Sequence, residues 1–229
     1  MPRNFMPALV PALIAAACAE DLSVHVRSGD RPPDPGFLVL STGVDVDRFQ
    51  IVLRNLRLQS DPTDGGFSTP GMVVIGPGPY LVDLSGPNLT GGVFTELVSG
   101  CGIRPKGFYE MDIDLVPVSQ ADVQANSALA PLLGKTYVIT GANQQGTSFT
   151  FESSSNQVLV RESVFRMGLN HNNVDVNIAP NRWFELPDGG TIDPTTSDPA
   201  LRSMIEANVA ASIDAYEDDN MDGVPDPLG

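Results

Sequence analysis

The feature that most constrains the fold of this chain is an alternation of apolar and polar residues in short runs. The alternation has period two, the period with which successive side chains of a β-strand point to opposite faces. Glycine- and proline-rich stretches typical of turns separate one run from the next. The runs lie at residues 22–27, 49–58, 80–84, 108–116, 137–140, 148–151, 157–160, 164–168 and 174–178.

This pattern predicts a mainly β protein. About nine short strands without helical periodicity between them favour an antiparallel β-sandwich, of the Ig-like or transthyretin-like kind. The high content of turn formers, Gly 22 and Pro 20, agrees with many short elements joined by turns. No stretch after the leader has the roughly 18 consecutive apolar residues that a transmembrane helix requires.

One segment near the C-terminus departs from the strand pattern. Residues 198–216 begin with Asp198 as an N-cap and a proline at the first helical position. Apolar residues then recur on one helix face, at Leu201, Ile205, Val209 and Ile213. We therefore expect one C-terminal helix. The predicted organisation is a signal peptide over 1–17, a β-sandwich domain over 18–188, and the helix with an acidic loop over 189–229.

The N-terminus has the pattern of an export signal. Arg3 precedes a short apolar run, which has the length of a signal-peptide core and is too short to span a bilayer. The run ends in three alanines before Cys18, and this resembles the lipobox of bacterial lipoproteins. The resemblance implies lipidation of Cys18, a membrane as partner, and, with Ala19 next, an outer-membrane location facing the periplasm or the surface. The alternative is a secretory signal cleaved after Ala17 or Ala19.

The second cysteine depends on this choice. If Cys18 carries lipid, Cys101 is a lone buried thiol; otherwise a Cys18–Cys101 disulfide can form in an oxidising compartment. The charge of the chain limits its partners further. Asp+Glu 28 against Lys+Arg 13 give a formal charge of -15, which repels nucleic acid and favours cations. We expect no nucleic-acid partner, and the sequence does not identify a protein or glycan partner.

The most specific chemical pattern is an acidic segment near the C-terminus. Oxygen-bearing side chains occupy loop positions 1, 3, 5 and 9, with Gly223 at position 6. The segment resembles the EF-hand calcium loop and the Asp-x-Asn-x-Asp-Gly-x-x-Asp unit of thrombospondin type-3 repeats. The resemblance implies a Ca²⁺ ion held by the side chains at these positions and by one carbonyl at position 7. These ligands are Asp218, Asn220, Asp222, Asp226 and the carbonyl of Val224.

The acidic loop differs from an EF-hand loop at position 12. EF-hands have a bidentate glutamate there, whereas this chain has Gly229. We therefore expect weak binding, with a Kd of about 0.1–1 mM, as in extracellular calcium modules. Such a site stays largely filled outside the cell, which favours a structural staple over a calcium sensor. A solvated acidic tail is the alternative interpretation.

Two other patterns suggest chemistry. Glu110, Asp112 and Asp114 alternate with apolar residues, so all three lie on one strand face. Carboxylates at such spacing can serve a glycoside hydrolase, although a solvated sheet face has the same pattern. Trp183 and Tyr80 offer an aromatic platform for a carbohydrate or peptide, but an aromatic pair also commonly fills the end of a sandwich.

The remaining signatures argue against an enzyme. His25 and His171 are the only histidines, and neither has a second metal-ligating residue at ligand spacing, so both are expected to be structural. The chain has no nucleophile elbow, no His-Glu-x-x-His motif and no nucleotide-binding glycine loop. The sequence therefore predicts an exported, lipid-anchored, non-enzymatic binding or structural module with a weak calcium site.

Overall fold

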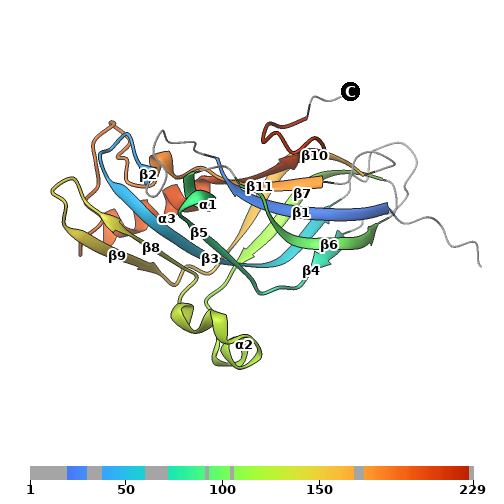
Figure 1. Ribbon diagram of the computed structural model, residues 1–229, viewed down its shortest axis with the longest axis horizontal. Coiled ribbons are helices and arrows are strands. Elements are labelled where there is room, and N and C mark those ends of the chain that lie inside the picture. The colour runs from blue at the N-terminus through green and yellow to red at the C-terminus, as the bar shows by residue number, and fades with distance from the viewer. Residues whose placement is uncertain are drawn as a thin grey trace, which may run out of the picture.

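The computed structural model describes residues 20–29, 38–59, 72–90, 93–103, 106–167 and 173–226. This part of the chain is mainly β and forms two sheets around a main hydrophobic core (Figure 1). The predicted mainly β, sandwich-like fold is confirmed, whereas its Ig-like or transthyretin-like type stays a prediction. The expected signal peptide, Cys18 and His171 lie outside the described residues. None of the described helices is both long and apolar enough to cross a bilayer.

The smaller sheet, sheet A, has four strands in the order β12-β11-β1-β6. Its antiparallel pairs are β12 with β11 and β1 with β6, but β1 and β11 run parallel. The parallel pair departs from the expected antiparallel sandwich, because alternation reveals which residues face the core but not the direction of a neighbouring strand. The strands are β1 (Glu20–Ser28), β6 (Thr95–Ile103), β11 (Asn173–Ile178) and β12 (Ile213–Glu217).

The larger sheet, sheet B, is organised around the long strand β3 (Asp45–Gln59). The first half of β3 lies between β5 and β8, and its second half lies between β4 and β7. Asn55 marks the change of neighbours with a left-handed φ of 45°, a conformation that asparagine tolerates better than most residues. The other strands are β2 (Leu38–Val39), β4 (Met72–Gly76), β5 (Tyr80–Ser85), β7 (Lys106–Leu115), β8 (Tyr137–Ala142), β9 (Ser148–Ser153) and β10 (Gln157–Met167).

The end of the sandwich beside β8 and β9 is closed by aromatic residues and by helix α3 (Pro199–Ala211). The ring of Trp183 lies 4.6 Å from that of Phe49, measured between centroids, and Phe184 lies 5.6 Å from Phe149. Ile205 of α3 is fully buried in the same core. The helix therefore packs as part of the body rather than as an appended tail.

The C-terminal helix ends earlier than the sequence pattern predicts. Asp198 caps it as expected, accepting a hydrogen bond from the amide of Ala200, but the helix stops at Ala211 and β12 follows. Ile213 falls on the predicted helix face, yet it is buried as the first residue of a strand paired with β11. Strand pairing therefore outweighs helical periodicity here.

Other local elements also differ from the prediction. The run 157–160 and the described part of the run 164–168, which ends at residue 167, belong to one strand, β10, and strands β2, β4 and β6 were not expected. Short helical turns also occur: α1 (Pro87–Thr90), α2 (Gln120–Ala125), η1 (Ser127–Leu132) and η2 (Pro180–Arg182). A capping box between Ser119 and Asp122 starts α2, which projects from the body with η1 (Figure 1). Leu129 and Leu132 of η1 bury a small second cluster with Val52.

Candidate metal centre in the C-terminal loop

The acidic loop begins where β12 ends and returns to the same place. The amide of Asp218 donates to the carbonyl of Asn173 on β11 at 3.1 Å, which extends the strand pairing into the loop. Eight residues later, the amide of Asp226 donates to the carbonyl of Glu217 at 3.0 Å. Asp218 is only 1% exposed. The first and last predicted ligands are therefore both fixed at the end of β12.

Inside the loop, the predicted ligand side chains turn toward the backbone. The two carboxylate oxygens of Asp218 accept from the amides of Asp222 at 3.1 Å and Gly223 at 2.8 Å. Asn220 Oδ1 also accepts from the Asp222 amide, at 2.9 Å. Asp222 Oδ1 in turn accepts from the amide of Val224 at 2.8 Å. These bonds hold the side chains at positions 1, 3 and 5 on the inner side of one turn.

Two further features close the loop. Asp226 Oδ2 accepts from the amide of Asp219 at 2.7 Å, so position 9 folds back over the start of the loop. Gly223 has a φ of 82°, a conformation that glycine adopts without strain. A side chain at this position would also collide with the guanidinium of Arg27. The glycine at position 6 is thus required by backbone conformation and by the packing beneath the loop.

The predicted ligand atoms of the loop are of the chemical type that binds calcium. All five predicted ligands are hard oxygen atoms, the type that Ca²⁺ prefers, and an oxygen that accepts one amide keeps a second lone pair. Within the described ranges, no three His, Cys, Asp or Glu side chains gather into a metal-binding group. Two predicted ligands are not carboxylates: Asn220 offers a side-chain amide oxygen, and Val224 offers a backbone carbonyl oxygen. The loop therefore has a suitable donor set, while its carboxylates are engaged by backbone amides.

A buried polar cluster beneath the loop was not found from the sequence. Arg27 of β1 donates through Nε to Asp175 Oδ2 at 2.8 Å and through Nη2 to the hydroxyl of Tyr216 at 2.9 Å. The same Nη2 donates to the carbonyl of Gly223, to which the Tyr216 hydroxyl donates at 3.1 Å. We call Arg27, Asp175 and Tyr216 the Arg27 clamp. It attaches the turn of the acidic loop to the outer face of sheet A.

Burial sets the electrostatics of the Arg27 clamp. It raises the pKa of Asp175 to about 6, although the charge and hydrogen bond of Arg27 act in the opposite direction. Burial also raises the pKa of Tyr216 to about 12, so its hydroxyl remains a donor near neutral pH. Burial lowers the pKa of Arg27, but its hydrogen bonds and the neighbouring charges outweigh this effect, and the pKa lies above its usual value. Arg27 therefore stays charged under the loop.

His25 lies on β1 at the edge of this cluster. The residue is 9% exposed, and its ring meets that of Phe94 edge-on with 6.2 Å between centroids. Desolvation lowers the pKa of His25, although the charges of Glu96 and Asp218 favour its protonated form. It is thus a buried histidine on a strand.

Two of the three β7 carboxylates, those of Asp112 and Asp114, pair with Arg57 of β3. Arg57 Nη2 lies 2.6 Å from Asp114 Oδ1, and Arg57 Nε lies 3.4 Å from Asp112 Oδ2. The Arg57 hydrogen bond lowers the pKa of Asp114, whereas burial and the charge of Asp112 raise that of Glu110. A raised carboxyl pKa is one property of a catalytic acid, but the pairing with Arg57 occupies both neighbouring carboxylates. The arrangement is that of a charge-paired sheet face.

Trp183 does not form an exposed platform. Its side chain is fully buried, and its indole nitrogen donates to Ser212 Oγ at 2.7 Å. Tyr80 is partly buried and packs against the main core. An aromatic binding surface at Trp183 is therefore excluded, and the residue fills the end of the sandwich.

Comparison of the chain with known protein families, with characterised proteins and with solved structures gives no match. Cys101 lies in β6, where it is paired with Leu22 near the start of β1. Its thiol is not among the described side chains, so its pairing or isolation stays a prediction.

Proposed function

We propose that this protein is an exported, lipid-anchored, non-enzymatic module of the outer membrane, in which Ca²⁺ staples the C-terminal loop to sheet A. The observation that carries the proposal is the hydrogen bonding of the loop. The side-chain oxygens of Asp218, Asn220 and Asp222 accept amides from within one turn, so the donors at positions 1, 3 and 5 share its inner side. A cation of the size and hardness of Ca²⁺ suits such donors.

Charge balance supports a divalent cation. The loop places four aspartates, Asp218, Asp219, Asp222 and Asp226, within nine residues, and Asp218 is almost fully buried. Arg27 contacts the carbonyl of Gly223 but also pairs with Asp175, so its charge is shared with a second carboxylate. Bound Ca²⁺ offsets the repulsion among the aspartates, and the free energy of binding adds to the stability of the folded loop.

The position of the loop supports a structural role. The loop is bonded to β11 through Asn173 and to β1 through Arg27. Strand β1 begins at Glu20, two residues after the cysteine predicted to carry the lipid. A filled calcium site therefore reinforces the strand that directly follows the proposed membrane anchor.

The test is calcium titration of the purified protein by calorimetry, combined with unfolding at fixed calcium. We expect a Kd of about 0.1–1 mM and a gain of about 1.4 kcal/mol in unfolding free energy at ten times the Kd. Asp222→Ala removes a ligand and should abolish both effects. Asp47→Ala, which removes an exposed aspartate of β3, should change neither. Absence of calcium binding by the native protein, or unchanged binding by Asp222→Ala, would contradict the proposal.

A further inference from the structure

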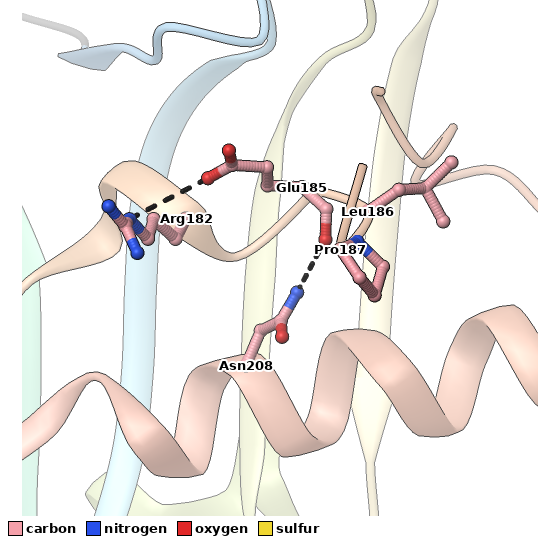
Figure 2. Close-up of a pocket in the computed structure, with 5 residues that line it drawn as sticks. All are labelled: Arg182, Glu185, Leu186, Pro187 and Asn208. Carbon is pink, nitrogen blue, oxygen red and sulfur yellow. Dashed lines mark hydrogen bonds and ion pairs between the residues drawn. The ribbon is translucent and has the colours of Figure 1, made fainter. Parts of the chain in front are cut away.

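Two adjoining pockets form a groove between helix α3 and η2 with the turn after it, and Figure 2 shows the residues that line the first of them. It has two lobes, and Arg182 and Asn208 line both of them. The first lobe, of about 190 Å³, lies between α3 and the turn at Leu186 and Pro187. The second, of about 450 Å³, runs past the end of α3 to Asn177 of β11 and reaches the size range of small-molecule sites.

Asn208 is a rigid element of the groove wall. Its Nδ2 donates to the carbonyl of Glu185 at 2.9 Å and to that of Trp183 at 3.2 Å, which occupies both of its N–H groups. The side-chain oxygen is turned away from Glu185 in Figure 2. Asn208 thus presents a fixed acceptor between the two lobes, held by the turn that it supports.

The second lobe adds polar groups of both kinds. Asn177, Asn181 and Asp214 line this lobe, and Asn181 and Asp214 are exposed. Arg182 has a side chain 81% exposed, with its Nε 3.7 Å from Glu185 Oε2. The lobe is thus lined by amide donors and acceptors, one guanidinium and one carboxylate. Since Arg182 and Asp214 carry opposite charges, the lining of this lobe has no net charge.

The polar lining of the second lobe indicates which class of ligand it can bind. A lining without net charge gives no advantage to an anion or a cation, and only the small side chains of Ala179 and Ala211 are apolar in the second lobe. A hydroxyl group both donates and accepts, so a ligand with several hydroxyls can satisfy amides, guanidinium and carboxylate together. We propose that the second lobe of the groove binds a neutral saccharide of one or two rings. The site is separate from the acidic loop and does not depend on calcium.

Trp183 provides a reporter for this site. It is the only tryptophan of the chain, and its indole bonds to Ser212, which lines the second lobe. The experiment is titration of the native protein with maltose, cellobiose and lactose, followed by tryptophan emission and calorimetry. Trialanine and spermidine serve as the peptide and cation alternatives. At least one disaccharide should bind saturably and change the emission.

Variants place the binding within the groove. Asn181→Ala and Asp214→Ala remove exposed polar groups of the lining and should each weaken binding about three- to tenfold. Asn156→Ala removes an exposed asparagine from the β9–β10 connection and should leave the affinity unchanged. The proposal is overturned if no disaccharide binds, or if both groove variants bind like the native protein. Binding of trialanine or spermidine without any disaccharide would also overturn it.

Discussion

Arg27–Asp175, beneath the C-terminal loop, and Arg57–Asp114, on sheet B, are two arginine–aspartate pairs of similar length in different surroundings. The nitrogen–oxygen distances are 2.8 Å and 2.6 Å. Burial raises the pKa of Asp175 to about 6, whereas the Arg57 hydrogen bond lowers the pKa of Asp114. The arginine lowers the pKa of the carboxyl group in both pairs, but at Asp175 the effect of burial is larger, so the net shifts have opposite directions.

Exposure explains this difference. The side chains of Arg27 and Asp175 are 6% and 2% exposed, while those of Arg57 and Asp114 are 17% and 14% exposed. Asp114 also accepts from Asn55 Nδ2 at 2.7 Å, whereas Asp175 Oδ1 is buried without a hydrogen-bond partner. The free energy lost when a carboxylate is removed from water can exceed the attraction of one neighbouring charge, if part of the carboxylate has no hydrogen bond. Pair length alone is therefore a poor guide to what an ion pair contributes.

The largest expected effect is that of removing Arg27. Arg27→Ala leaves Asp175 buried without a cation and should lower the unfolding free energy by about 3–5 kcal/mol. Arg57→Ala also removes a cation, but Asp112 and Asp114 are more exposed to water than Asp175 is. We therefore expect a smaller loss of unfolding free energy, about 1–3 kcal/mol. Urea denaturation of both variants measures the difference.

The control for this prediction is a double variant. Arg27→Ala combined with Asp175→Asn removes the uncompensated charge and should recover part of the loss, because the two residues are coupled. Equal losses for Arg27→Ala and Arg57→Ala would show that burial does not separate the two pairs.

The second prediction concerns pH. The folded pKa of Asp175 is about 6 against an ordinary value of 3.8, so the folded protein holds a proton over this window that the unfolded chain has released. The stability gained from this proton is fully present below the unfolded pKa of 3.8, and it is lost as pH rises through the folded pKa of about 6. A pKa raised from 3.8 to about 6 corresponds to at most about 3 kcal/mol of stability. Asp114 has a lowered pKa, so its contribution is lost as pH falls.

Denaturation of matched variants between about pH 3 and about pH 7 tests these signs. Native stability relative to Asp175→Asn should fall as pH rises, and native stability relative to Asp114→Asn should rise. Two slopes of the same sign would refute the contrast between the pairs. The comparison requires calcium to be fixed, because the Arg27 clamp contacts the proposed calcium loop.

The two regions also differ in how far the sequence predicts them. The carboxylate face of β7 is visible in the alternation of Glu110, Asp112 and Asp114, and strand periodicity is local. Its partner Arg57 becomes known only once β3 and β7 are in register. Arg27 and Asp175 are 148 residues apart and meet through a parallel strand pair, which no local pattern encodes. Long-range pairing therefore limits the prediction at both sites, and more severely at the buried one.

The same limit applies to the missed elements. Strand β6 contains two glycines and lacks clear alternation, and β12 is hidden because Ile213 continues the helical spacing of α3. In contrast, the spacing of the acidic loop is a local property, and the structure places Asp218, Asn220 and Asp222 around one turn. The attachment of that turn by Tyr216 and Arg27 required the three-dimensional structure.

The smallest expected effect extends the comparison to a third pair, at the surface. Arg48 and Asp83 have side chains 48% and 32% exposed, and Arg48 Nε donates to Asp83 Oδ1 at 2.8 Å. The Arg48 hydrogen bond lowers the pKa of Asp83, but exposed pairs contribute only about 0–1 kcal/mol. Asp83→Asn retains an acceptor for Gln50 and should cost less than about 1 kcal/mol in urea denaturation. About 1 M salt should remove most of this cost but leave most of that of Arg27→Ala, because buried pairs are poorly screened. A loss at Asp83 as large as that at Arg27 would show that burial does not rank these pairs.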